Sequence, residues 1–152
     1  MVPGANASCK WPNDVLADEK KLAGILVETP VPTRMVIGIG INVNSRAEDF
    51  DSQVSATSLR SLNGTPIDAA LLLRETLNDF SSRARSLADN ADSLPELWRE
   101  FDGLRDRDVS IQLAGETVAG RAQGVNENGH LQLLSGEGLR TFASGTVRAT
   151  GT

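Results

Sequence analysis

The chain has 152 residues, enough to bury one core, or one core with a small appended domain. Its hydrophobic content of 39% and charged content of 23% are ordinary for a soluble globular protein. The net charge of −5 argues against a general affinity for nucleic acid or anionic membranes, because both need concentrated lysine and arginine.

A single cysteine, Cys9, excludes an internal disulfide and suits a reducing compartment. No apolar stretch is long enough to span a bilayer, and the N-terminal residues lack the basic and apolar segments of a signal peptide. The sequence therefore predicts a soluble, cytoplasmic protein.

Three short apolar runs near the N-terminus predict buried strands at residues 8–11, 22–27 and 35–43. Turn residues at positions 12–14 and 18–20 separate the first two runs. Pro30 and Pro32 follow the second run. Because proline cannot donate to a strand ladder, we expect them to end that strand.

The middle of the chain has the periodicity of helices. Asp68 is a plausible N-cap for a first helix. A second helix is expected to start near residues 93–95. One apolar stripe on the first helix contains Leu73, Leu77, Phe80, Ala84 and Leu87, and the inner side of the second contains Leu97, Trp98 and Phe101.

After Leu104 the pattern becomes that of strands. Apolar and polar residues alternate in short runs, and turn sequences at residues 115–116, 126–129 and 136–138 interrupt them. Five short strands in fewer than fifty residues predict a small β-barrel. A barrel of this size has little core of its own, so we expect it to be a cap or docking module.

The stretch KWPND places Lys10 beside a tryptophan and a proline. Trp11 is held extended because it precedes proline, so Lys10 is expected at a strand end with a fixed direction. An ammonium held against a dry sheet needs an anion, either a ligand carboxylate or phosphate or a nearby acidic side chain. For a lone lysine, a surface ion pair is the commoner arrangement. The nearby acidic residues are Asp14, Asp18, Glu19 and Glu28.

Gly24, Gly38 and Gly40 lie inside predicted strands, where glycine weakens the strand unless something must approach the backbone. Tight sheet packing is the alternative explanation. Gly38 and Gly40 do not form a dinucleotide fingerprint, since neither a third glycine nor a helix follows. Asn42 points to one face and could bond a phosphate or a ribose, whereas Asn44 is better explained as a turn residue.

The ordered set KWPND, KLAGILVE and GIGINVN resembles the biotin protein ligase family. The resemblance runs from about Cys9 to Asn44 and continues less specifically to the C-terminus. It implies an α+β fold, with a mixed or antiparallel sheet and helices related to class II aminoacyl-tRNA synthetases, followed by a small SH3-like β-barrel. Residues 1–104 would then be the C-terminal part of the catalytic domain, and residues 105–152 the SH3-like domain.

The resemblance also implies an activity. The family joins biotin to ATP, releases pyrophosphate, and transfers the biotinyl group from the adenylate to a lysine of a carboxylase's biotin carboxyl carrier domain. Magnesium on the phosphates and a fixed ammonium would neutralise the negative charge that slows this attack.

Particular residues match the family's pattern. Lys10 matches the active-site lysine that contacts the biotin carboxylate and the adenylate phosphate. Asn42 matches a nucleotide-contacting asparagine, and Arg148 falls where the terminal domain reaches the nucleotide. The glycines that would let the backbone approach the ligand are Gly24, Gly38 and Gly40.

The chain also departs from the family. Only nine residues precede Lys10, so we expect the family's GRGRxGR loop, half of the sheet and any N-terminal DNA-binding domain to be missing. The chain would then be a C-terminal piece, or would pair with something that supplies the rest. The open sheet edge is an association hazard that makes a homodimer conceivable.

Other functions stay open. One is a non-catalytic oligomerisation module built on residues 24–28. A lipoate-type acyl ligase shares the fold, but the Trp-Pro after Lys10 speaks against it. A nucleic-acid-binding barrel is disfavoured by the acidic balance and the absence of tyrosine.

Overall fold

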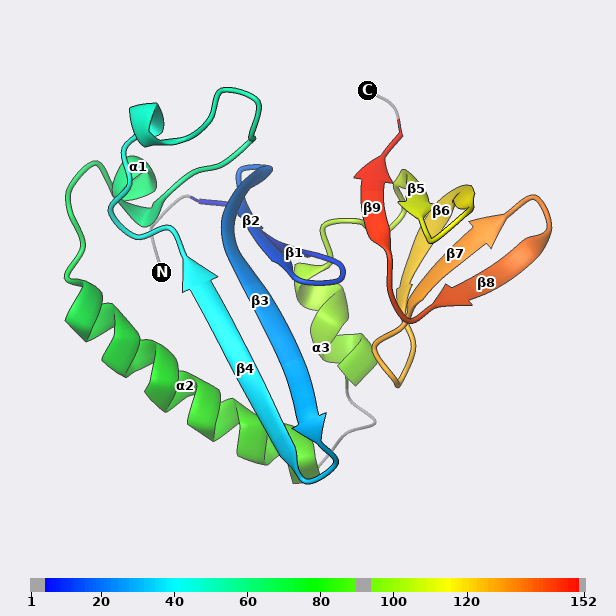
Figure 1. The fold of residues 1–152 in the computed structure, drawn as a ribbon, viewed down its shortest axis with the longest axis horizontal. Coiled ribbons are helices and arrows are strands. Elements are labelled where there is room, and N and C mark those ends of the chain that lie inside the picture. The colour runs from blue at the N-terminus through cyan, green and yellow to red at the C-terminus, as the bar shows by residue number, and fades with distance from the viewer. Residues whose placement is uncertain (1–4, 90–93, 151–152) are drawn as a thin grey trace. The chain divides into compact units, whose positions relative to one another are not determined.

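The computed structural model describes residues 5–89 and 94–150 (Figure 1). The chain folds as two compact units that interleave in sequence. The first contains the chain up to Ser8 together with Asn13–Asp79, and the second contains Cys9–Pro12 together with the chain from Phe80 onward. The KWPND motif is therefore divided, with Lys10 in the second unit.

The N-terminal sheet has four strands in the order β1-β2-β3-β4 (Figure 1). The strand β2 was not predicted, because only three residues separate the two predicted turns that flank it. Asp18 and Glu19 both have positive φ, as a two-residue hairpin turn requires, which confirms the predicted turn. The strands are β1 (Ala7–Lys10), β2 (Asp14–Ala17), β3 (Lys20–Val31) and β4 (Arg34–Ile41).

The strand β3 is longer than predicted. It continues through Pro30 and ends at Val31, directly before Pro32. Pro32 therefore follows the end of the strand, as expected, whereas the expectation that Pro30 also ends it was wrong. The pairing of β3 with β4 runs regularly as far as Glu28, and its register then shifts before Val31. Pro30 lies within this irregularity, where no regular ladder hydrogen bond is required of it.

The far part of the β3–β4 hairpin carries exposed apolar side chains. Leu26 and Val27 are 57% and 50% exposed, although successive strand residues point to opposite faces. On β4, Val36 and Ile37 show the same pattern, at 54% and 37%. Within the described residues, both faces of this hairpin are therefore uncovered.

Asp68 caps α2, as predicted: its Oδ1 accepts hydrogen bonds from the backbone N–H groups of Ala70 (2.9 Å) and Leu71 (3.1 Å). None of the helices in the described ranges is long and apolar enough to cross a membrane. The helices are the 3-10 helix η1 (Ala47–Asp49) and the α-helices α1 (Leu59–Asn63), α2 (Ala69–Asp89) and α3 (Leu94–Phe101).

The predicted apolar stripes are less buried than expected. Leu73, Leu77 and Phe80 of α2 are exposed, and so are Leu97 and Phe101 of α3, whereas Trp98 is partly buried. Periodicity identifies residues that share one face of a helix, but it does not show whether another element covers that face. The side chain of Leu87 and the predicted helix start at Ser93 lie outside the described residues.

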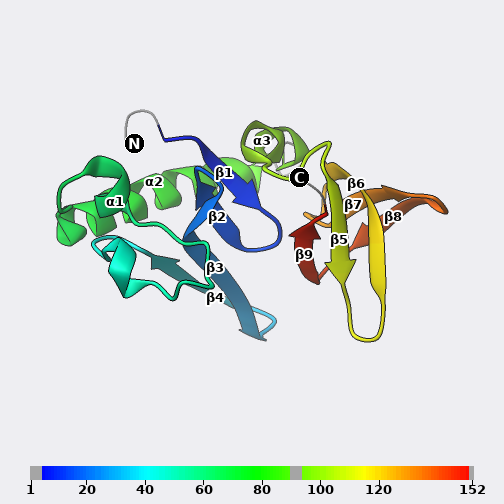
Figure 2. The same ribbon diagram turned by 90° about the horizontal axis from the view of Figure 1, so that it is seen from above.

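The second sheet confirms the five strands predicted after Leu104. They form an antiparallel sheet in the order β8-β7-β6-β5-β9, and Figure 2 shows β5 and β6 as a hairpin. The alternating apolar residues of these strands form one buried cluster, which also contains Trp11. The strands are β5 (Asp108–Gln112), β6 (Thr117–Val125), β7 (Leu131–Ser135), β8 (Gly138–Phe142) and β9 (Thr146–Ala149).

The α+β class predicted from the sequence is confirmed: the structure has two antiparallel sheets and few helices. The predicted boundary between residues 104 and 105 stays a prediction.

Candidate functional site

The first unit contains an open hollow of about 520 Å³ on β3 and β4, which we call the β3–β4 hollow. Its volume lies in the range of small-molecule sites, roughly 300–1,000 Å³. The structure thus brings the three predicted glycines together at one place. The lining residues are Asn13, Asp14, Lys21, Gly24, Ile25, Leu26, Gly38, Ile39 and Gly40.

Packing does not explain the glycines of β4. A Cβ added at Gly38 would meet nothing closer than the Leu26 carbonyl oxygen at 3.8 Å. A Cβ at Gly40 would meet the Gly24 carbonyl oxygen at 3.9 Å. Since these are ordinary contacts, tight sheet packing does not require glycine at Gly38 or Gly40. The space that both leave open belongs to the hollow.

An ion pair lies at the hollow, between Lys21 and Asp14. The Lys21 Nζ is 2.5 Å from the Asp14 Oδ1, and both side chains are partly exposed. A Cβ at Gly24 would lie 3.5 Å from the Lys21 Nζ, an ordinary contact, so the lysine side chain does not require glycine there either. Asp14 was a possible partner for Lys10, but the structure pairs it with Lys21.

Lys21 was missed as a site residue by the sequence analysis, although it opens the second motif of the resemblance. Two backbone hydrogen bonds fix the position of Lys21 in β3. The Lys21 N–H donates to the Ser55 carbonyl oxygen (2.9 Å), and the Lys21 carbonyl oxygen accepts from the Thr57 N–H (2.9 Å). A basic side chain on a fixed backbone, beside three glycines, can attract an anionic ligand.

Lys10 is the last residue of β1 and is half-buried. Within residues 5–89 and 94–150, its ammonium makes no hydrogen bond or ion pair. Next to it, partial burial raises the pKa of the Cys9 thiol above its ordinary value, and the negative charge of Asp102 adds to this effect. Lys10 is thus half-buried, and no acidic side chain in the described residues forms an ion pair with it.

Asn42 follows β4, and its side-chain amide bonds the backbone of two other segments. Its Nδ2 donates to the carbonyl oxygens of Lys21 (3.3 Å) and Thr57 (3.0 Å). These bonds use both amide hydrogens and leave the Oδ1 as the group that a ligand could approach. Asn44 bonds Ile67 with both ends of its amide, which agrees with a turn role.

Arg148 lies in β9, opposite Ser110 of β5. Its side chain is exposed, while its neighbour Val147 is buried in the core of the sheet. A contact of Arg148 with a nucleotide stays a prediction. In the described residues, no group of three or more His, Cys, Asp or Glu side chains could hold a metal ion.

Two family models match this chain. Residues 2–44 match the biotin/lipoate A/B protein ligase family, and residues 106–148 match the biotin protein ligase C-terminal domain. The first match contains Lys10, Lys21 and the three glycines of the hollow. The second contains Arg148.

Curated relatives of this chain are also named as ligases. The bifunctional ligase/repressor BirA of Bacillus subtilis is 31% identical over 151 residues, which are 95% of this chain and 46% of the relative. The biotin–[acetyl-CoA-carboxylase] ligase of Mycobacterium tuberculosis is 33% identical over 147 residues, 96% of this chain and 54% of the relative. The chain spans about half the length of the curated relatives it matches.

Solved structures agree with the fold. The apo biotin protein ligase from Aquifex aeolicus has a TM-score of 0.84 and 27% identity, over 95% of this chain and 66% of that one. The same enzyme in complex with biotin and ATP has a TM-score of 0.83 at 27% identity, over 95% of this chain and 62% of that one. The two family models, the relatives and these structures agree, and the chain belongs to the biotin protein ligase family.

Proposed function

We propose that this chain carries part of the biotin-activating site of a biotin protein ligase. The observation that carries the proposal is the β3–β4 hollow, in which the glycines of two family motifs and the Lys21–Asp14 pair meet. A related enzyme of the same fold binds biotin and ATP.

The reaction begins with attack by the biotin carboxylate on the α-phosphorus of ATP. A bond forms between a carboxylate oxygen and that phosphorus, and the bond to the oxygen bridging the α- and β-phosphorus breaks. Biotinyl-AMP and pyrophosphate result. In the second step, a lysine amine of a carrier domain attacks the biotinyl carbonyl carbon, and AMP leaves.

The main electrostatic obstacle is the meeting of two anions. We assign its neutralisation to Lys10, because a lysine ammonium is a compact point charge suited to a phosphate or carboxylate. Asn42 through its Oδ1 and Arg148 through its guanidinium are proposed to contact the nucleotide. Gly24, Gly38 and Gly40 are proposed to let the backbone approach the ligand.

Magnesium would arrive with ATP. Its preferred ligands are oxygens, and in nucleotide sites it commonly binds substrate phosphates with one or two carboxylates. Because the described residues contain no cluster of metal-binding side chains, the phosphates themselves would supply most of its ligands. When bound, the ion lowers the negative charge of the phosphates.

The acceptor proposed for the biotinyl group is the biotin carboxyl carrier domain of a carboxylase, and the proposed compartment is the cytoplasm. A ligase of this name in Mycobacterium tuberculosis resembles the chain over nearly its whole length. Its name states acetyl-CoA carboxylase as the protein that it modifies.

The exposed hairpin suggests that the site needs further polypeptide. Leu26, Ile25 and Ile39 line the hollow and are also exposed. We propose that polypeptide outside this chain covers them and completes the biotin pocket. The 152-residue chain alone should therefore bind biotin more weakly than micromolar, because few contacts remain to offset immobilisation of the ligand.

The test is pyrophosphate release, dependent on biotin and ATP, by a polypeptide of full family length that contains these 152 residues. Lys10→Ala should lower the rate by at least about a hundredfold, the usual scale for loss of one key electrostatic contact. Lys20→Ala is the matched control, because Lys20 is exposed at the start of β3 and should leave the rate unchanged. Wild-type release by Lys10→Ala would refute the role of Lys10.

A second candidate function is oligomerisation without catalysis, as a homodimer, and the exposed apolar hairpin favours it. Residues 24–28 of β3 already pair with β4, so a partner would have to use another edge or an open face. Calorimetry on the polypeptide of full family length separates the candidates: heat on adding biotin or ATP supports a ligase site. Self-association with no response to either ligand supports the oligomerisation module.

A further inference from the structure

Trp11 has an unexpected place in the fold. Although it lies close to the N-terminus in sequence, it belongs to the second unit and is only 4% exposed. It packs in the same buried cluster as inward-facing residues of all five strands of the second sheet. A buried tryptophan supplies a large apolar contact and needs a partner for its N–H. The core of the C-terminal sheet is thus completed by the residue next to Lys10.

The indole N–H of Trp11 has a fixed partner. Its Nε1 donates to the Gly129 carbonyl oxygen at 3.0 Å. Gly129 lies in the turn between β6 and β7, with φ of +74°, a conformation that favours glycine. Asn126 closes this turn: its N–H donates to the His130 carbonyl oxygen (3.0 Å), and its carbonyl oxygen accepts from the Gly129 N–H (2.9 Å).

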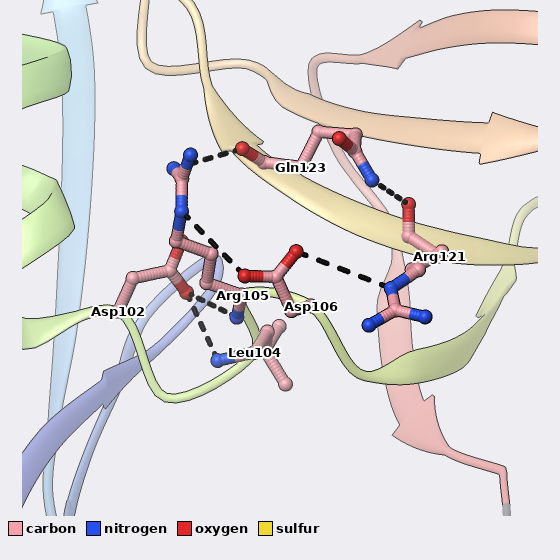
Figure 3. A network of polar contacts seen from close by, with 6 residues as sticks. All are labelled: Asp102, Leu104, Arg105, Asp106, Arg121 and Gln123. Atoms are coloured by element: carbon pink, nitrogen blue, oxygen red, sulfur yellow. Dashed lines mark hydrogen bonds and ion pairs between the residues drawn. The ribbon is translucent and has the colours of Figure 1, made fainter.

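A second anchor lies on the other side of Lys10. The Cys9 carbonyl oxygen accepts a hydrogen bond from the Gly103 N–H at 2.9 Å. The turn that contains Gly103 is itself held, since the Asp102 Oδ1 accepts from the Arg105 N–H (3.2 Å). The Arg105 Nη1 in turn donates to the Gln123 carbonyl oxygen of β6 (2.9 Å), as Figure 3 shows.

An ion pair reinforces this connection. Asp106 lies between Arg105 and Arg121 in Figure 3, with Oδ–Nε distances of 4.0 Å and 3.9 Å. These side chains are substantially exposed, so the pairs add little stability by themselves. The hydrogen bond from Arg105 to Gln123, rather than these pairs, links the Asp102–Asp106 turn to β6.

The backbone of Lys10 is thus held at both neighbours, while its ammonium has no partner in the part of the chain that the structure describes. Building on the function proposed above, we propose that Trp11 is a positioning residue for Lys10. The C-terminal sheet, by taking the indole into its core, fixes where the lysine side chain projects.

This inference gives the C-terminal sheet a role in biotin activation. A cap or docking module could be removed without moving Lys10. Here, loss of the sheet would remove both anchors, because Gly129 and the Gly103 turn belong to the second unit. The position of the lysine and the integrity of the sheet are therefore coupled.

The experiment compares two tryptophans of one core. Trp11→Phe keeps an aromatic ring but removes the donor to Gly129. Trp98→Phe is the matched control, because Trp98 packs partly against the same cluster and its Nε1 is buried without a hydrogen-bond partner. The 152-residue chain and both variants are treated with an amine-acylating reagent, and the labelling rates of Lys10 and exposed Lys20 are measured by peptide mass spectrometry.

We expect the ratio of Lys10 to Lys20 labelling to rise at least about threefold in Trp11→Phe, as the half-buried lysine loosens, and to stay unchanged in Trp98→Phe. Far-ultraviolet circular dichroism shows that the variants are folded. If Trp11→Phe does not fold, Asn126→Ala loosens the turn of Gly129 instead, because it removes the Asn126 Oδ1 that accepts from the N–H groups of Asn128 (3.1 Å) and His130 (2.9 Å). It should raise the same ratio. An unchanged ratio in a folded variant that has lost the Trp11–Gly129 bond overturns the proposal.

Activity separates this inference from the proposed function. In a polypeptide of full family length, Trp11→Phe should lower kcat for pyrophosphate release and leave the KM for biotin nearly unchanged. If the Lys10 labelling ratio rises but no biotin-dependent pyrophosphate release occurs even in the wild type, the anchoring stands and the ligase assignment fails. If release occurs and Trp11→Phe leaves kcat unchanged, the ligase assignment stands and the positioning role fails.

Discussion

The two sheets of this chain differ in how far their apolar side chains are buried. In the C-terminal sheet, residues such as Val109, Ile111 and Leu133 are completely buried. In the β3–β4 hairpin, residues with the same chemistry are exposed to solvent, for example Val36 at 54% and Ile37 at 37%. The C-terminal sheet encloses a core within its own unit. The β3–β4 hairpin, by contrast, has apolar faces that nothing in the described residues covers.

This difference bears on function. A sheet with a closed core can hold neighbouring residues in fixed positions, as it does with Trp11. A hairpin with uncovered faces can only offer part of a site, because ligand pockets usually bury most of the ligand. The glycines of β4 face such an open space. Stability and ligand binding should therefore be separable by mutation in this chain.

The largest expected effect on stability comes from one substitution made in both sheets. Ile111→Ala should lower the free energy of unfolding by about 2–5 kcal/mol, because Ile111 is completely buried and a cavity would remain. Ile37→Ala removes the same atoms from an exposed site and should cost less than about 1 kcal/mol. Urea unfolding measures both. Equal losses would show that the hairpin is as well packed as the C-terminal core.

A smaller effect distinguishes the glycines of the two sheets. A Cβ at Gly120 would lie 2.8 Å from the Leu134 carbonyl oxygen, a backbone atom that cannot easily move. Gly120→Ala should therefore destabilise the protein by about 1–3 kcal/mol. Gly38→Ala meets only ordinary contacts and should leave stability unchanged or slightly raised.

The Gly38 variant also sharpens the site. Because Gly38 lines the hollow, a methyl group there should weaken biotin or ATP binding in a polypeptide of full family length, although the fold is intact. Thermal unfolding and calorimetry on the same sample make the comparison. Loss of stability in Gly38→Ala, or full binding by it, would contradict the assignment of this glycine to a ligand.

Sequence reasoning succeeded where a segment contains its own constraints. The five C-terminal strands alternate clearly and are separated by strong turns, and Asp68 caps α2 through its own neighbours. It failed where the outcome depends on distant partners. The pattern of β3 suggested an end before Pro30, but the register shift opposite β4 accommodates that residue.

In the candidate site, too, local sequence patterns did not reveal contacts between distant residues. The glycines could be selected from the sequence, because glycine in a strand pattern is locally anomalous. The Lys21–Asp14 pair could not, since it depends on how β2 pairs with β3, where the register shifts between Val15 and Leu16. The anchoring of Trp11 joins residues 118 positions apart, and no local pattern marks it.

Exposed apolar area gives a further, smaller difference. Leu26 and Val36 lie on one face of the hairpin, so the double variant Leu26→Thr/Val36→Thr should reduce binding of a hydrophobic dye by about half. Leu134→Thr/Leu139→Thr is the matched control, because this cross-strand pair is also exposed but stands on a closed sheet. It should change dye binding much less.

The same variants test association. Sedimentation of the wild-type chain at increasing concentration should show self-association through the hairpin, and the Leu26/Val36 variant should suppress it. Both double variants should stay within about 0.5 kcal/mol of the wild type in stability, since they alter exposed sites. If the Leu134→Thr/Leu139→Thr variant suppressed association instead, the surface that self-associates would belong to the C-terminal sheet.

The smallest expected effect is a dependence of stability on pH above 8. Folding raises the pKa of the Cys9 thiol, chiefly through burial and also through the charge of Asp102, so the folded state favours the protonated form. Its contribution to stability is complete below the unfolded pKa, about 8.5, and is lost as the pH rises through the higher folded pKa. Cys9→Ser removes this titration while keeping a small side chain at the Gly103 anchor.

Urea unfolding at pH 7, 8.5 and 9.5 should therefore show a slightly steeper decline for the wild type than for Cys9→Ser. Every other group contributes equally to both proteins, so the difference isolates the thiol. Alkylation of Cys9 with iodoacetamide at pH 8 should likewise be slower in the folded chain than in urea, because only the thiolate reacts. A folded chain that reacts as fast as the unfolded one would show that Cys9, and with it the strand end that carries Lys10, is not partly buried within the second unit as the structure describes.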